Sequence, residues 1–204
     1  MISSTHRSIR KLISRKLPDI AETAKTLTCR SLNHQPEYFL SLKVAEAIQE
    51  HFKSYTFSME VNLRDICENA GIAIDQVPLE YRIEGSKRAD LVISNSRTGR
   101  YQHVIEFKRG SKGINLMKDA KRLAWLCQNA DLGHKMEKNF LLAITAASRD
   151  VLERRSKAFG AMLDDEFPYV SLKSEYIDLS TFKSTSPKTK GKPLQAMVWE
   201  FNYK

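Results

Sequence analysis

Two short segments of β-branched and aromatic residues, separated by a polar turn, most constrain how this chain can fold. Residues 88–93 have the sequence RADLVI, and residues 103–108 have the sequence HVIEFK. The segment between them, residues 94–100, is polar and contains a glycine. This pattern predicts two neighbouring strands joined by a turn.

The second of these strands carries two charged residues on one face. Because strand side chains alternate between faces, Glu106 and Lys108 point one way, and Ile105 and Phe107 point the other. A hairpin brings Asp90 beside them, in a register that the sequence leaves open. The expected result is two carboxylates and one ammonium at the end of an otherwise apolar sheet.

This arrangement resembles the active site of the PD-(D/E)XK nuclease superfamily, which has the restriction-endonuclease-like fold. The matching residues are Asp90 on one strand and Glu106-Phe107-Lys108 on the next, with Ala89 where the family name has proline. The resemblance covers roughly residues 36–148. It implies an α/β fold with a central mixed β-sheet flanked by helices.

The resemblance also implies an activity, the metal-dependent hydrolysis of phosphodiester bonds, with DNA favoured over RNA. Asp90 and Glu106 would bind Mg²⁺ or Mn²⁺ together with the carbonyl of Phe107, since carboxylates are hard oxygen ligands suited to these ions. Lys108 would assist the attacking water and contact the phosphate. The alternatives are a catalytically inactive module of the same fold that binds nucleic acid or a protein partner, and an RNA-processing enzyme.

A fourth candidate catalytic residue, Glu37, begins a helix expected over about residues 36–53. Its buried stripe is expected to contain Leu40, Val44, Ala47, Ile48 and His51. Glu37 falls inside this stripe, whereas Glu46 and Glu50 fall on the far side. Family members often place a Glu of this helix in the metal site; the alternative is that Glu37 only caps its own helix.

The remaining elements follow from periodicity. We expect strands over Tyr55–Val61, Val77–Glu84, 140–147, Tyr169–Leu179 and Leu194–Phe201, and helices over 62–71, 114–130 and Arg149–Asp165. Glu60 and Glu80 lie on two of these strands and could approach the site, although most strand carboxylates face water. The basic, turn-rich segment 183–192 is expected to be a mobile hairpin tip or a loop that orders on DNA.

Basic residues after the second strand are candidate nucleic-acid contacts. They are Arg109, Lys112, Lys118, Lys121 and Arg122, the last three on a helix face away from its buried stripe. The alternative for each is an ordinary solvated charge. The formal net charge of +9 favours a polyanionic partner.

Residues 1–35 form a basic helical segment whose first helix is expected to stop near Pro18, and residues 36–204 form the nuclease-like domain. The 204 residues have an ordinary balance of 28% charged and 42% hydrophobic residues, and the longest apolar run, 140–147, is too short for a membrane span. We therefore expect a cytoplasmic protein without a membrane partner. Cleavage of both strands would favour a homodimer.

Overall fold

The computed structural model describes residues 8–78, 88–110, 113–130, 136 and 138–204. The helices are α1 (Ile9–Thr28), α2 (Glu37–His51), α3 (Leu63–Asn69), α5 (Gly113–Asn129) and α6 (Arg149–Glu166), with short 3₁₀ turns η2 (Leu32–His34), η3 (Ile74–Gln76) and η4 (Pro187–Thr189). The strands are β1 (Tyr55–Asn62), β2 (Arg88–Asn95), β3 (Tyr101–Arg109), β4 (Lys138–Thr145), β5 (Val170–Lys183) and β6 (Pro193–Tyr203). No helix of the described residues is long and apolar enough to cross a membrane.

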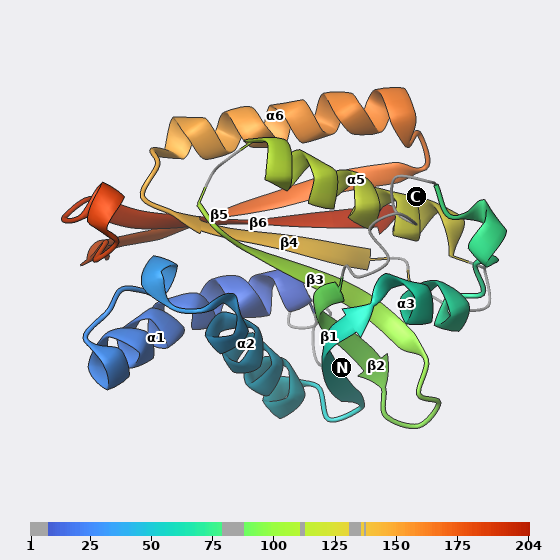
Figure 1. Ribbon diagram of the computed structural model, residues 1–204, viewed down its shortest axis with the longest axis horizontal. Helices are drawn as coiled ribbons and strands as arrows, with labels where there is room; N and C mark the ends of the chain where they lie inside the picture. Colours follow the sequence, from blue (N-terminus) through green and yellow to red (C-terminus); the bar gives the residue numbers. More distant parts are fainter. Residues whose placement is uncertain (1–7, 79–87, 111–112, 131–135, 137) are drawn as a thin grey trace, which may run out of the picture.

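The strands form one mixed sheet in the order β1-β2-β3-β4-β6-β5. β3 and β4 are parallel, and every other neighbouring pair is antiparallel. Figure 1 shows α5 and α6 over one face of the sheet and α1 and α2 over the other. The predicted α/β class, with a central mixed sheet flanked by helices, is therefore confirmed.

Each face of the sheet has its own hydrophobic core. On one face the sheet packs against α3, α5 and α6, and on the other against α1 and α2. β4 belongs to both cores, because Leu141 and Ala143 face α5 while Leu142 and Ile144 face α1 and α2. This explains why β4 is a continuous apolar run, as expected of a strand buried on both sides.

The prediction that the first helix stops near Pro18 was wrong, since α1 continues through Pro18 to Thr28. An internal proline removes one helical hydrogen bond and costs about 3 kcal/mol. Leu17 and Ala24, which flank Pro18, are both fully buried against the sheet. Apolar burial along the whole helix, at roughly 1.5–3 kcal/mol for each large side chain, outweighs the cost of the proline.

A predicted strand also differs in the structure. Val77 and Pro78, expected to begin the strand Val77–Glu84, lie outside any strand, and residues 79–84, including Glu80, lie outside the described residues. β1 pairs directly with β2 instead, with Met59 opposite Leu91 and Val61 opposite Ala89.

The basic segment 183–192 is tied to the body of the protein rather than free. The amide of Thr185 donates to Ser31 Oγ at 2.8 Å, and the amide of Ser31 donates to Thr185 Oγ1 at 2.9 Å. Asn33 Nδ2 also donates to Ser184 Oγ at 3.0 Å. These bonds hold the β5–β6 hairpin against the connection between α1 and α2.

Candidate active site

The two central strands bring Asp90, Glu106 and Lys108 together on the face covered by α5. Leu91 pairs with Ile105 across the antiparallel β2–β3 ladder, and this register places Asp90 beside Glu106. Val92 and Val104 on the same face pack against α5, whereas Ile105 lies in the opposite core. The predicted grouping of the three charged residues is therefore found, and the register that the sequence left open is defined.

Asp90 is bound to the neighbouring strand through its side chain. Its Oδ2 accepts a hydrogen bond from the amide of Phe107 at 2.7 Å. Burial raises the pKa of Asp90, while the charge of Lys108, the Phe107 amide and a side-chain hydrogen bond with Glu106 lower it in part. The charge of Asp90 in turn raises the pKa of Glu106, as expected of two neighbouring carboxyl groups.

Helix α5 contributes two charged residues to the same cluster, and one of them, Asp119, is not predicted as a site residue. Arg122 Nη2 lies 2.5 Å from Glu106 Oε1 and 2.9 Å from Asp119 Oδ1. Lys108 Nζ lies 3.2 Å from Asp119 Oδ2 and 3.9 Å from Glu106 Oε2. Three carboxylates and two cations thus form one connected network.

The burial of this network perturbs its proton affinities. Glu106 is 1% exposed, and burial raises its pKa, opposed by Arg122 and reinforced by Asp90 and Asp119. Burial disfavours the charged form of Lys108, but the negative charges of Asp119, Glu106 and Asp90 outweigh it, so the pKa of Lys108 is raised. Lys108 is therefore an ammonium at neutral pH.

Asp119 could have been found from helical spacing. It lies three residues after Leu116 and four before Leu123, two fully buried members of the α5 stripe. A charged residue on the apolar stripe of a helix needs a buried partner, which is a signal for a polar site beneath the helix.

Other predicted residues of α5 occupy different positions. The prediction that Arg122 lies away from the buried face was wrong, because its side chain is buried. Lys121 forms an ion pair with Glu166 at 2.6 Å, and Lys118 is exposed. The role of these residues as nucleic-acid contacts stays a prediction, and Lys112 lies outside the described residues.

Glu37 faces the sheet as expected, but it contacts the end of β3 rather than the carboxylate pair. Its Oε1 accepts from the amide of Arg109 at 3.3 Å and lies 3.8 Å from Arg109 Nε. Its charge also contributes to the raised pKa of Lys108. Glu46, expected to be solvated, forms an exposed ion pair with Lys43.

Glu60 approaches the site from β1. It lies between the paired residues Met59 and Val61, so it faces Asp90 across the ladder, and its charge contributes to raising the pKa of Asp90. Its φ of 55° lies in the left-handed region, which non-glycine residues rarely adopt. Such strain often occurs at functional sites.

The donor set of the cluster fits a divalent cation. Asp90 and Glu106 are adjacent oxygen donors, and burial raises the pKa of both, which a bound cation would oppose. Within the described part of the chain there is no group of three or more His, Cys, Asp or Glu side chains arranged to hold a metal ion.

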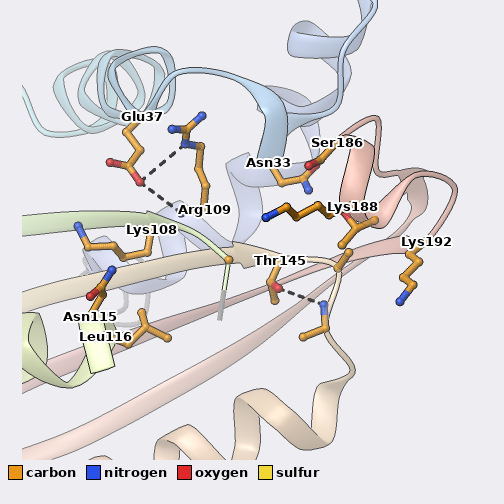
Figure 2. Close-up of a pocket in the computed structure, with 14 residues that line it drawn as sticks. Asn33, Glu37, Lys108, Arg109, Asn115, Leu116, Thr145, Ser186, Lys188 and Lys192 are labelled. Carbon is orange, nitrogen blue, oxygen red and sulfur yellow. Dashed lines mark hydrogen bonds and ion pairs between the residues drawn. The ribbon is translucent and has the colours of Figure 1, made fainter. Parts of the chain in front are cut away.

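A cavity of about 530 Å³ opens beside Lys108 at the carboxyl ends of β3 and β4. Figure 2 shows Lys108, Arg109 and Glu37 on one side of it and Lys188 and Lys192 of the β5–β6 hairpin on the other. Ligands of open α/β sheets commonly bind at the carboxyl ends of parallel strands.

Comparisons with protein-family models, with curated proteins and with solved structures give no match for this chain.

Proposed function

We propose that this protein is a metal-dependent nuclease of the PD-(D/E)XK type that hydrolyses phosphodiester bonds, with DNA as the favoured substrate. The observation that carries the proposal is the position of Asp90, Glu106 and Lys108 on one face of two adjacent strands. The order of elements supports it, because α2, the β1–β2–β3 meander, α5 and the buried strand β4 follow one another as in that fold.

Asp90 and Glu106 would hold Mg²⁺ or Mn²⁺, with the Phe107 carbonyl as a further ligand from the same strand. When bound, the cation would position and acidify a water molecule and polarise the phosphate. The chain's own residues complete the site. Asp119 fixes the ammonium of Lys108 at 3.2 Å, and Lys108 can then donate to a phosphate oxygen and stabilise the charge that develops on it.

The neighbouring carboxylates raise the pKa of Lys108, which favours a role as a donor and an electrostatic group, whereas a bound cation would lower this pKa. A metal ion that bound here would also have to compete with the ion pairs that Glu106 already forms. Arg122 already neutralises one oxygen of Glu106, so metal binding would place a second positive charge beside the same carboxylate.

That competition is the observation that favours a second candidate function, a non-catalytic module that binds nucleic acid or a protein partner. In that case the network is a buried ion-pair cluster with a structural role. The near-complete burial of Glu106 and its ion pair with Arg122 are typical of such a cluster. The two functions differ in whether metal reaches Asp90 and Glu106.

The test is cleavage of single- and double-stranded DNA and RNA with Mg²⁺, Mn²⁺ or EDTA. We expect metal-dependent cleavage of DNA that Asp90→Ala and Lys108→Ala abolish, with Lys108→Ala retaining metal binding measured by calorimetry. Glu37→Gln should slow turnover, whereas its matched control on the same helix, Glu46→Gln, should not. Binding of nucleic acid without cleavage, unchanged in Asp90→Ala, would instead establish the non-catalytic module.

A further inference from the structure

Three of the segments that line the cavity beside Lys108 are the end of β3, the end of β4 and the β5–β6 hairpin, and residues 33, 37, 115 and 116 complete the described lining. Gly110, with a φ of +124°, turns the chain at the end of β3, and its amide donates to the carbonyl of Ile144 at 2.8 Å. Residues 145–147 follow β4, where Thr145 Oγ1 accepts from the amide of Ala147 at 3.0 Å. The third wall is the β5–β6 hairpin.

Hydrogen bonds fix the position of the β5–β6 hairpin. Besides its bonds to Ser31 and Asn33, it is braced internally, since the amide of Gly191 donates to the carbonyl of Ser184 at 2.9 Å and the amide of Lys192 to the carbonyl of Thr189 at 3.0 Å. The two internal hydrogen bonds join backbone atoms only. The side chains of Lys188 and Lys192 are exposed at the cavity.

The cavity carries an unbalanced positive charge. Among the described residues, its charged lining consists of Lys108, Arg109, Lys188 and Lys192 against the single carboxylate Glu37. Glu37 pairs with Arg109 at 3.8 Å, and Lys108 pairs with Asp119 at 3.2 Å. No carboxylate of the described residues forms an ion pair with Lys188 or Lys192, so these two lysines supply the excess.

The rest of the lining suits a phosphate backbone rather than bases. Hydroxyl and amide side chains come from Asn33, Asn115, Thr145, Ser186 and Thr189, and none of the described lining residues is aromatic. Single-strand binders that hold bases use aromatic rings as stacking platforms. Ammonium, hydroxyl and amide donors are instead the groups that contact phosphates without reading sequence.

We propose that this cavity binds the sugar-phosphate backbone of the nucleic acid next to the bond to be cut, with Lys188 and Lys192 as phosphate contacts. The inference rests on the proposed nuclease function and adds a backbone-binding site to it. Lys108 connects the cavity to the charged cluster, because it lines the cavity and also contacts Asp119 and Glu106.

The experiment measures binding of a short fluorescein-labelled DNA duplex by anisotropy, in EDTA, over a series of salt concentrations. The test variant is Lys188→Glu/Lys192→Glu. Its control is Lys53→Glu/Lys157→Glu, which makes the same charge change at two exposed lysines outside the cavity. Lys53 lies beyond the far end of α2 from Glu37, about 20 Å along the helix axis.

We expect the test variant to bind at least about tenfold more weakly than wild type at moderate salt, with a salt slope smaller by about 2. The control should change both values much less, and Lys188→Arg/Lys192→Arg should bind like wild type. Where cleavage is measured, KM should rise and kcat should stay nearly constant, because neither lysine reaches the reacting atoms.

Two outcomes would overturn the inference. One is an equal loss of affinity in the test and control variants, which would mean that only net charge matters. The other is strong competition by millimolar inorganic phosphate at constant ionic strength, which would make the cavity a site for a free anion. Since binding is measured without metal, failure of cleavage in wild type would remove the proposed function without deciding the result for the cavity.

Discussion

The carboxylate of Asp119 lies 3.2 Å from the ammonium of Lys108, and one helical turn later Arg122 binds the same carboxylate at 2.9 Å. Asp119 therefore positions both cations of the cluster. Asp119 is joined to Lys108 and Arg122 by ion pairs, whereas it acts on Glu106 through its charge, which raises the pKa of Glu106. Its role is to hold Lys108 in place.

We predict that Asp119→Asn destabilises the fold by about 2 kcal/mol, because it leaves two buried cations short of one carboxylate. Cleavage should fall about tenfold as Lys108 loses its fixed position. Urea unfolding and single-turnover rates measure the two effects. The matched control is Glu153→Gln, which breaks an exposed pair with Arg149 and should leave the stability nearly unchanged. Similar losses in both variants would contradict a buried positioning role.

The pH dependence of stability should reveal the carboxylate pair. The folded pKa of Glu106 is raised above its ordinary value of 4.5. Its contribution to stability is therefore complete below about pH 4.5 and is lost as pH rises through the raised pKa. In EDTA, wild type should lose more stability than Glu106→Gln between pH 5 and 9.

Addition of Mg²⁺ should offset that loss in wild type but not in Glu106→Gln, since the ion binds the deprotonated pair. Thermal unfolding over the pH series, with and without Mg²⁺, measures both effects. Parallel pH profiles for the two proteins would show that Glu106 is not the titrating group.

His103 should make an opposite contribution at acidic pH. Burial lowers its pKa from 6.5 to about 4, and the ring lies between Tyr55 and Phe140 with Nδ1 bonded to the carbonyl of Lys138 at 2.8 Å. The neutral ring therefore stabilises the fold above pH 6.5, and this contribution of at most about 3 kcal/mol is lost as pH falls toward 4.

The measurement is unfolding between pH 7 and 4. His103→Gln should lose less stability over this range than wild type does. The control His51→Gln alters an exposed histidine and should retain the full acid dependence. An unchanged acid dependence in His103→Gln would exclude this histidine as its source.

We expect the backbone of Glu60 to lower the stability of the fold and its side chain to support metal binding. Its φ of 55° costs about 1 kcal/mol for a residue with a Cβ, and glycine avoids that cost. We expect Glu60→Gly to be about 1 kcal/mol more stable than Glu60→Ala, while both bind Mg²⁺ more weakly than wild type. Chemical unfolding and metal titration of the three proteins test this. Equal stability of the two variants would show that the backbone there is not strained.

The sequence predicted those parts of the site that depend on local periodicity. Alternation along β3 was enough to place Glu106 and Lys108 on one face, and helical spacing was enough to turn Glu37 toward the sheet. The pairing of Asp90 with Glu106 was not predictable, because register depends on the whole ladder and on the turn. The burial of Arg122 was missed because one of its two partners, Glu106, lies on another element.

Two further differences have the same origin. A proline normally ends a helix, but the burial of Leu17 and Ala24 keeps α1 intact across Pro18, and burial is a property of the assembled fold. The turn-rich composition of residues 183–192 indicated mobility, whereas Ser31 and Thr185 fasten the segment across 154 residues of sequence. Neither the burial of α1 nor the hydrogen bonds between Ser31 and Thr185 can be recognised from the neighbouring sequence.

The position of β6 between β4 and β5 has a consequence for how the protein is made. β6 is the last strand along the chain, yet it lies inside the sheet, and β5 joins the sheet only through it. During synthesis the strands that carry Asp90 and Glu106 leave the ribosome long before residues 193–203 do. The nascent chain therefore displays its carboxylates while the hairpin wall is still missing, and the cavity forms only after residues 183–203 have emerged.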